Sequence, residues 1–201
     1  NGSHVVEAID WNGNIATTLF WVGPRITIVP DSGYVETQAT IYGSNFGANK
    51  TVTIFWDVEV IGTASTDGNG SFIYAFTVPH AINGMHRVIA IDQAGNTAYT
   101  YYIVYAHMAV SDTSGHVGDI ITINGTGFAN TTIVTVYWDG MQTQRGEISN
   151  TMGDVTLTFM VPESPQGVHE IQCIDSDGNP SNIIYPWSKT GLPCKYRGSS
   201  K

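Results

Sequence analysis

The sequence predicts an all-β protein made of tandem β-sandwich domains, and three observations lead to this. Charged residues make up only 12% of the 201 residues, while Gly, Thr, Ser and Asn are abundant. Aromatic and β-branched residues are frequent, which favours half-buried strands joined by tight turns over helices. The third observation is an internal repeat, which recurs with spacings of 82 and 83 residues.

The repeat is clearest in a short motif, Gly-x-His, five further residues, and then Asp-x-x-Gly-Asn. The motif begins at Gly2, at Gly84 and at Gly167, and other landmarks keep the same spacing, since 43–46 matches 125–128 and 52–57 matches 134–139. The repeat predicts four parts: the C-terminal hairpin of a preceding repeat (1–23), two full repeats (24–106 and 107–188), and a basic tail (189–201).

Each full repeat shows about seven short strands separated by turn signals. In the first repeat we expect strands over 25–30, 36–43, 51–57, 58–63 and 71–78, followed by a final hairpin over 85–105. Pro79 ends the strand before it, because proline has no N–H for the ladder. Short strands with turns every 8–12 residues or so are typical of a sandwich.

Alternation along the strands predicts which side chains are buried. Trp56 lies on the predicted buried face of the third strand, and His86 and Ala90 share a face of the sixth. We expect the large Trp56 to pack against the small Ala90, and Trp138 to pack in the same way against Cys173.

These residues resemble a known family. The run 40–47 and its counterpart 122–128 resemble the opening of an IPT/TIG-type immunoglobulin-like domain. The closing run 90–96 resembles the last hairpin of immunoglobulin-like repeats in prokaryotic cell-surface proteins, such as S-layer proteins, filament subunits and adhesins. The resemblance covers nearly all of 1–188. It implies tandem immunoglobulin-like sandwiches, and it leaves the function open because such modules serve many proteins.

The charge distribution limits the partners. A net charge of −9 argues against nucleic acid, because no basic stripe is present to neutralise phosphates. Residues 1–188 hold all 17 acidic residues and four of the eight basic ones, whereas the tail is purely basic through Lys189, Lys195, Arg197 and Lys201. The tail is interpreted either as a solubilising extension or as a segment that docks on the acidic body of a neighbouring copy.

The termini and the hydropathy bear on the location. No apolar run approaches the roughly 20 residues that span a membrane. The chain has no signal peptide and does not begin with Met, so we expect a processed product or a piece of a longer protein. We expect this protein at the cell surface, outside the cell.

Asn-x-Ser/Thr sequons indicate candidate glycosylation sites. Five are present, at Asn1, Asn49, Asn69, Asn124 and Asn130. The four after Asn1 are our candidate sites. The alternative is that Asn and Thr are simply common in turns and strands.

The last Asp-x-x-Gly-Asn motif offers a candidate calcium site. Asp175, Asp177 and Asn179 alternate as oxygen ligands do at the start of a calcium loop, but the downstream Glu of that pattern is missing. The alternative is a hairpin turn in which Gly takes a left-handed conformation and Asp caps its own backbone. The histidines of the three motifs lie a domain length apart, so we expect structural roles for them and no zinc site.

Two cysteines leave three alternatives open. Cys173 falls on the inward face of its strand, and Cys194 lies in the tail. A Cys173–Cys194 disulfide requires the tail to fold back on the last domain, which suits an oxidising extracellular setting. The others are a buried thiol with a free tail thiol, and an intermolecular bridge through Cys194.

No catalytic motif is recognisable, so the sequence predicts a protein that is not an enzyme and contains no catalytic residues. We expect a structural unit of a cell-surface layer or filament, whose partners are other copies of itself, assembled through sandwich contacts or strand addition. The alternative is an adhesin or carbohydrate-binding stalk that binds glycans through its aromatic residues, and the other option is an accessory part of an enzyme. The candidate aromatic residues are Trp11, Trp21, Trp187, Tyr101, Tyr102 and Tyr105.

Overall fold

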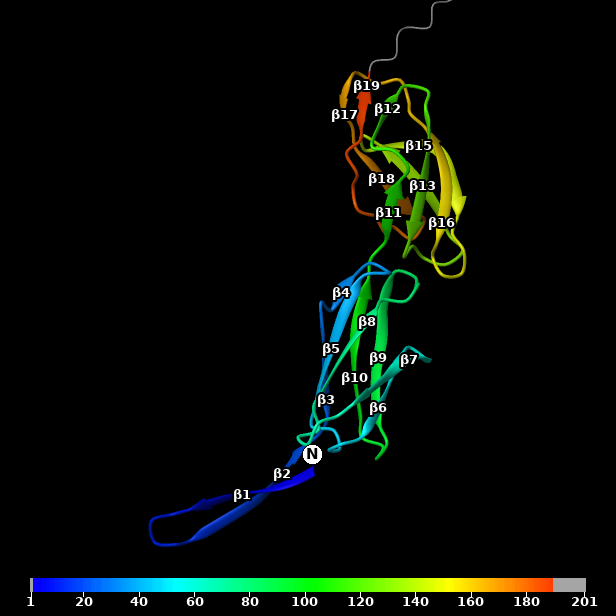
Figure 1. Ribbon diagram of the computed structural model, residues 1–201. Helices are drawn as coiled ribbons and strands as arrows, with labels where there is room; N and C mark the ends of the chain where they lie inside the picture. Colours follow the sequence, from blue (N-terminus) through cyan, green and yellow to red (C-terminus); the bar gives the residue numbers. More distant parts are fainter. Residues whose placement is uncertain (1, 190–201) are drawn as a thin grey trace, which may run out of the picture. The chain divides into compact units, whose positions relative to one another are not determined.

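The computed structural model describes residues 2–189, which form strands and loops with no helix among them (Figure 1). The all-β prediction is therefore confirmed. No helix long and apolar enough to cross a bilayer occurs in this range. By their internal contacts the residues form two compact units, Asn1–Pro79 with Gly84–Ile103, and His80–Asn83 with Val104–Lys201. Each is described by itself.

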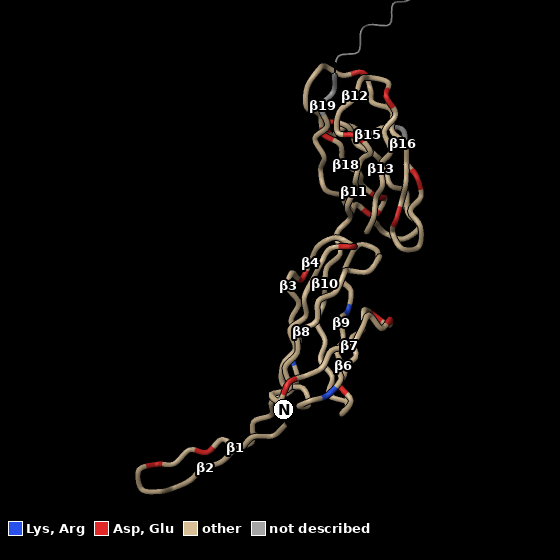
Figure 2. The backbone as a smooth tube through the Cα atoms, viewed as in Figure 1, with Lys and Arg blue, Asp and Glu red and all other residues tan. Residues whose placement is uncertain are grey.

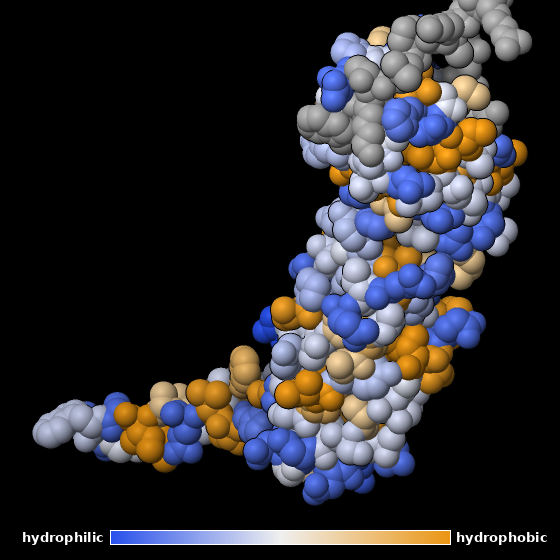
Figure 3. Space-filling model, turned by 45° about the horizontal axis from the view of Figure 1, so that its top comes forward, coloured by the Kyte–Doolittle hydropathy of each residue, from blue (hydrophilic) through white to orange (hydrophobic). Residues whose placement is uncertain are grey.

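The first unit begins with a two-stranded hairpin. Strands β1 (Gly2–Ile9) and β2 (Ile15–Val22) pair in antiparallel register from Gly2↔Val22 to Ile9↔Ile15. Among the described strands they pair only with each other. Apolar side chains gather along the hairpin in the view of Figure 3. Large apolar residues of both of its faces are exposed to solvent.

The rest of the first unit is a sandwich of two sheets. One sheet has the order β3-β5-β8, and the other has the order β4-β10-β9-β6-β7. The strands are β3 (Arg25–Val29), β4 (Ser32–Gly33), β5 (Gln38–Ser44), β6 (Thr51–Trp56), β7 (Glu59–Ser65), β8 (Phe72–Thr77), β9 (Gly84–Asp92) and β10 (Thr97–Val104). They follow the predicted strands closely, and β4 is the short strand that the sequence did not predict.

The core of this sandwich comes from the predicted alternation. Val52 and Ile54 of β6 are fully buried and Trp56 is 5% exposed, while the residues between them face outward. In β9 every second side chain from His86 to Asp92 is buried in the same way. Alternation with a period of two places each of these faces against the facing sheet.

The second unit contains the second sandwich, whose strands form three small sheets. The orders are β11-β13-β16, β15-β14-β18 and β12-β19-β17. The strands are β11 (His107–Val110), β12 (Ser114–His116), β13 (Ile120–Thr126), β14 (Ile133–Trp138), β15 (Met141–Ile148), β16 (Val155–Met160), β17 (Gly167–Val168), β18 (Ile171–Asp175) and β19 (Trp187–Lys189). Acidic residues are frequent in its turns and loops (Figure 2).

The last segment of the second sandwich departs from the expected hairpin. After the turn at 175–179 the chain makes only isolated bridges, Ile174↔Pro180 and Ile171↔Ile184. Pro180 and Pro186 carry no N–H, so a regular ladder opposite β18 cannot form there. The next strand, β19, pairs instead with β12, in parallel register with Ser114↔Trp187.

The same tight clasp joins a loop to a glycine turn in both sandwiches. The Phe46 N–H donates to the Gly70 carbonyl at 3.0 Å, and the Phe128 N–H donates to the Gly153 carbonyl at 3.0 Å. Both glycines have a positive φ, 74° and 79°. A Cβ at Gly70 would lie 2.0 Å from the Phe46 carbonyl oxygen, so both the conformation and the close approach require glycine.

A backbone position nearby predicts a stabilising substitution. Thr131 has φ 51°, and the equivalent Asn49 of the first repeat has φ 53°. A β-branched residue is strained in the left-handed region, whereas asparagine tolerates it. Thr131→Asn is therefore expected to raise the free energy of unfolding of the second domain by roughly 0.5–1 kcal/mol, measured by urea denaturation.

The matched control is Asn49→Thr, which should lower the stability of the first domain by a similar amount. It also removes the sequon at Asn49, so both variants should be produced without glycosylation. A destabilised Thr131→Asn protein would contradict this account of the turn.

Candidate functional site

The structure brings the repeated motif together at the closing hairpin of each sandwich. Asp92, at the end of β9, is 4% exposed and accepts four hydrogen bonds. Its Oδ1 accepts the N–H groups of Ala94 at 2.8 Å and Asn96 at 2.9 Å. Its Oδ2 accepts the Asn96 side-chain amide at 2.8 Å and the Gly47 N–H at 2.7 Å. One carboxylate thus shapes the hairpin turn and also ties it to the loop after β5.

The second sandwich repeats this arrangement. Asp175 Oδ1 accepts the N–H groups of Asp177 at 3.0 Å and Asn179 at 2.9 Å, and Oδ2 accepts the Ala129 N–H at 2.9 Å. Burial raises the pKa of the Asp92 carboxyl, but its hydrogen bonds outweigh this and leave the pKa lowered. The glycine of each turn has the predicted positive φ, 83° at Gly95 and 88° at Gly178.

The third copy of the turn has the same internal geometry in a different setting. Asp10 accepts the N–H groups of Asn12 and Asn14 at 2.8 Å each, and the Asn14 side-chain amide at 2.7 Å. Asp10 is exposed, and among residues 2–189 no counterpart of the Gly47 N–H reaches it. This hairpin is therefore formed but is not tied to a sandwich within the described chain.

The motif histidine forms a second repeated contact. The His86 ring stacks on Trp56 with centroids 5.0 Å apart, and its Nδ1 lies 2.8 Å from Asp57 Oδ2. Asp57 Oδ1 also accepts the Arg87 N–H at 2.8 Å. The register places Val88 opposite Trp56 and Ala90 opposite Ile54, so the small residue does not lie directly opposite the tryptophan, whose indole stacks on the histidine.

The second sandwich has the same cluster with one further bond. His169 stacks on Trp138 at 4.8 Å, and its Nδ1 lies 2.7 Å from Asp139 Oδ2. Its Nε2 lies 2.9 Å from the Pro165 carbonyl oxygen. As in the first sandwich, Trp138 does not pair with the small residue, because Cys173 lies opposite Val136.

The stability of the second domain should fall as pH rises through the folded-state pKa of His169. Burial lowers this pKa, but the hydrogen bonds to Asp139 and Pro165 outweigh it and raise the pKa above 6.5. A raised folded-state pKa adds stability below the unfolded-state pKa, and this stability is lost as pH rises through the folded-state value. Urea denaturation at about pH 5.5 and about pH 8.5 should show this loss.

The comparison with His169→Gln isolates the effect. Burial lowers the pKa of His107 in the same unit, so His107 contributes with the opposite sign in both proteins. The variant should lose less stability between the two pH values than the wild type loses. Equal losses of stability in the wild type and in His169→Gln would show that the contacts with Asp139 and Pro165 do not raise the pKa of His169.

The candidate calcium ligands lie in the last hairpin turn. Asp175 is occupied by N–H donors, including the Asn179 side-chain amide at 2.9 Å from Oδ2. The turn thus has the Asp-capped geometry of the alternative interpretation. Within the described residues no group of three or more His, Cys, Asp or Glu side chains is placed to hold a metal. Calcium binding at Asp175, Asp177 and Asn179 stays a prediction.

The structure describes one of the two cysteines of the predicted disulfide, Cys173. Cys173 is fully buried in β18, and burial raises the pKa of its thiol to about 12. A thiol with this pKa is almost wholly protonated at neutral pH and is a poor nucleophile. Cys194 lies outside the described residues, so the disulfide stays a prediction.

The sequons after Asn1 are all accessible. Asn49, Asn69 and Asn130 are exposed in loops and turns, and Asn124 is exposed in the middle of β13. Asn124 Oδ1 accepts the Thr156 hydroxyl at 2.9 Å, so its side chain is engaged with the neighbouring strand. Exposure is necessary for glycosylation, and modification itself stays a prediction.

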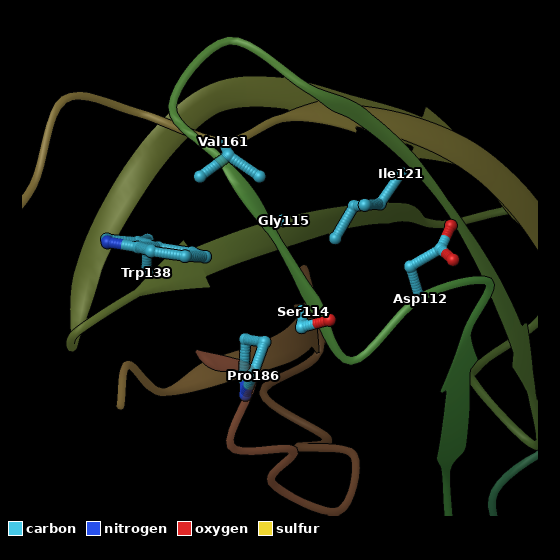
Figure 4. A pocket seen from close by; sticks show the side chains of 7 residues that line it. All are labelled: Asp112, Ser114, Gly115, Ile121, Trp138, Val161 and Pro186. Carbon is cyan, nitrogen blue, oxygen red and sulfur yellow. The ribbon is translucent and has the colours of Figure 1, made fainter. Parts of the chain in front are cut away.

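Two of the hollows in the structure differ greatly in size. In the second sandwich a cavity of about 10 Å³ lies between Trp138, Ile121, Val161 and Pro186, with Asp112 and Ser114 at its rim (Figure 4). It has room for about one water molecule. A wider, open depression of about 610 Å³ lies on the first sandwich, where Tyr42, Asp67 and Ser71 line it.

The candidate aromatic residues and the basic residues of the tail lie in different environments. Tyr102 is fully buried, so it belongs to the core and not to a sugar-binding surface. Trp11 is 96% exposed and Trp21 is 71% exposed, both on the first hairpin. Lys189 is the last residue of β19, whereas Lys195, Arg197 and Lys201 lie outside the described residues. The aspartates after the tryptophans were the functional residues that the sequence reading missed, although they recur at positions 57 and 139.

The solved structures that resemble this chain do so weakly. The adhesin InvE of Yersinia pseudotuberculosis is 10% identical, with 83% of this chain and 58% of that chain covered and a TM-score of 0.40. The SGBP-B protein of a Bacteroides ovatus mixed-linkage glucan utilization locus, solved with a heptasaccharide, is 15% identical, with 95% and 55% covered and a TM-score of 0.35. The fibronectin(III)-like modules of Clostridium thermocellum CbhA are 14% identical, with 82% and 94% covered and a TM-score of 0.29.

The chain thus spans little more than half the length of the first two proteins. No curated protein matched the sequence. The family comparison is specific, because the IPT/TIG domain matches residues 108–185, which contain strands β13 to β18 and the Asp175 turn. The IPT/TIG domain model thus matches the second sandwich, and the first sandwich shares the repeated landmarks of the second.

Proposed function

We propose that this chain is a structural part of an extracellular protein, a repeat unit that builds a cell-surface layer or filament from copies of itself and that is not an enzyme. The observation that carries the proposal is the Asp-x-x-Gly-Asn turn, which occurs three times with the same internal hydrogen bonds. In two copies the turn is tied to a sandwich, at Asp92 and at Asp175, and in the third, at Asp10, it has the same internal geometry. A chain that repeats one sandwich type in series suits a load-bearing or spacing role.

Two further features support this proposal. The sequons at Asn49, Asn69, Asn124 and Asn130 are exposed, which suits a protein that faces the outside of the cell. The cavity in the second sandwich has room for about one water molecule and not for a substrate.

Electron microscopy of native surface material, labelled with an antibody against this chain, tests the proposal. Label along sheets or filaments at regular intervals is the expected result. Label confined to dispersed single particles would contradict a structural lattice or filament.

A second candidate function is an adhesin or glycan-binding stalk, which the open depression on the first sandwich favours. Tyr42 is 46% exposed at this depression, beside the polar Asp67 and Ser71. An exposed aromatic ring beside hydrogen-bonding groups suits the face of a sugar. Binding to a glycan array that is lost in Tyr42→Ala and kept in Tyr99→Ala would select this function over the structural one.

A further inference from the structure

The first hairpin is an unpartnered sheet with large apolar side chains on both faces. Val6 and Phe20 are 51% and 61% exposed on one face, and Leu19 and Trp21 are 71% exposed on the other. An isolated two-stranded hairpin is marginally stable in water, and an exposed apolar patch of this kind marks an interaction site. The other copies of the hairpin in this chain show what covers such a face.

One face of this hairpin is nearly identical to the buried face of the β9–β10 hairpin. Seven of the eight inward positions carry the same residue, and Phe20 in place of Tyr102 is the exception. The shared residues are His4, Val6, Ala8, Asp10, Ala16, Thr18 and Val22, which match His86, Val88, Ala90, Asp92, Ala98, Thr100 and Val104.

The opposite face has diverged. Of its eight positions only Ile9 matches, with Ile91. Selective identity on one face indicates that this face packs against the same surroundings in both hairpins.

The contacts of β9 show which groups a segment that covers the inward face of the first hairpin would have to supply. In the first sandwich β6 pairs with β9, and it carries the Trp56 indole that stacks on His86. The next residue, Asp57, accepts a hydrogen bond from the Arg87 N–H. The counterpart of this N–H in the first hairpin is the Val5 N–H. The Gly47 N–H donates to Asp92 Oδ2, the oxygen whose counterpart in Asp10 lacks this donor among the described residues.

Within residues 2–189, a second copy of this chain offers no vacant cover of this type. In the first sandwich β6 is already paired with β9, and in the second β14 is already paired with β18. The cover must therefore come from a further sandwich of the same repeat that lacks its own closing hairpin.

We propose that β1 and β2 are the closing hairpin of a third immunoglobulin-like sandwich, whose remaining strands lie in the polypeptide directly N-terminal to residue 1. These strands supply a Trp-Asp pair to His4 and Val5, and a backbone N–H from a Phe-Gly or Phe-Ala turn to Asp10. The proposal concerns the architecture of the chain and stands independently of whether the assembled protein builds a lattice or binds glycans.

A hairpin exchange within the full chain tests the proposal. Residues 2–22 and 84–104 have the same length and nearly the same inward face. A chain in which a copy of 2–22 replaces 84–104 should keep the first sandwich folded, with amide exchange in β5, β6 and β8 as slow as in the wild type. Loss of that protection would overturn the proposal, because the hairpin would then not fit the sandwich type assigned to it.

Two variants of the exchanged chain separate the inward face from the outward one. In the transplanted hairpin, the Asp10→Ala change should accelerate exchange by about a hundredfold or more, because it removes the four-bond carboxylate. The Glu7→Ala change, on the outward face, should leave exchange unchanged. Equal effects of the two changes would overturn the assignment of the faces.

A second measurement uses an extended chain, in which a copy of residues 24–82 precedes Asn1 and supplies the proposed cover. Exchange of the β1 and β2 amides should slow by about a hundredfold or more relative to the original chain. Unchanged exchange in the hairpin would count against the proposal. Sedimentation of the original chain should show a monomer, and a dimer that Phe20→Asp dissociates would assign the cover to a second copy instead.

Discussion

Replacing Asp92 with alanine is expected to lower the stability of the first domain by about 3 kcal/mol or more. The buried carboxylate accepts four hydrogen bonds, and its loss leaves backbone N–H groups of Gly47, Ala94 and Asn96 without a partner. A hydrogen bond to a charged acceptor contributes roughly 1.5–3 kcal/mol, and the Gly47 and Asn96 donors are half-buried whereas Ala94 is exposed. Urea denaturation, monitored by amide exchange in the first domain, measures this loss of stability for that domain alone.

The chain supplies its own control for this variant. Asp10→Ala removes the same turn-capping carboxylate from the exposed hairpin, where no N–H of a facing sheet donates to it among the described residues. It should leave the amide exchange of both sandwiches unchanged. A milder effect of Asp92→Ala than of Asp10→Ala on the first sandwich would contradict the role of the hydrogen bond from the Gly47 N–H to Asp92.

Trp56→Ala is expected to cost about 3–5 kcal/mol, the range for removing a large aromatic residue from a core. The indole is 5% exposed and lies against three rings: Phe76 at 6.1 Å, His86 at 5.0 Å and Tyr102 at 5.7 Å. Truncation leaves a cavity and also removes the surface on which His86 stacks. The expected result is a first domain that unfolds at a much lower urea concentration.

Trp21→Ala is the matched control, because Trp21 is 71% exposed on the hairpin. It should change the stability of the first sandwich by less than about 0.5 kcal/mol, as surface substitutions usually do. Similar losses for the two tryptophans would place Trp56 outside the core and contradict the alternation along β6.

Local patterns explain why most of the fold could be predicted. Alternation placed Val52, Ile54 and Trp56 on one buried face, and the structure confirms this. The turn at 92–96 and the proline at 79 set the strand ends to within about two residues. These features depend on residues close in sequence, and they recur in both repeats.

What could not be predicted depends on register between distant strands. Ala90 lies opposite Ile54 and Val88 lies opposite Trp56, while the Trp56 indole stacks on His86. Alternation alone does not set this offset. The bond from Asp57 to His86 joins residues 29 positions apart in sequence. Pro180 is a local signal for the interrupted last strand of the second sandwich. No local signal in the sequence indicates that β19 pairs with β12.

The candidate site was predicted in part. The motif residues His86 and Asp92 were found by their spacing, and both are buried and hydrogen-bonded at the closing hairpin. Asp57 was missed as a site residue, because a lone Asp at the end of a strand reads as an ordinary turn residue. Its φ of 53° and its two bonds to the His86–Arg87 segment emerge only in three dimensions.

Amide exchange in the strands that precede the three equivalent turns of the unmodified chain, and in β2, tests the central claim most directly. The account predicts slow exchange in β9 and β18, where a facing sheet closes the sandwich, and fast exchange throughout β1 and β2, where the same motif has no sandwich. Protection of β1 and β2 equal to that of β9 in the monomeric chain would contradict the claim that this hairpin depends on a sandwich outside the described residues.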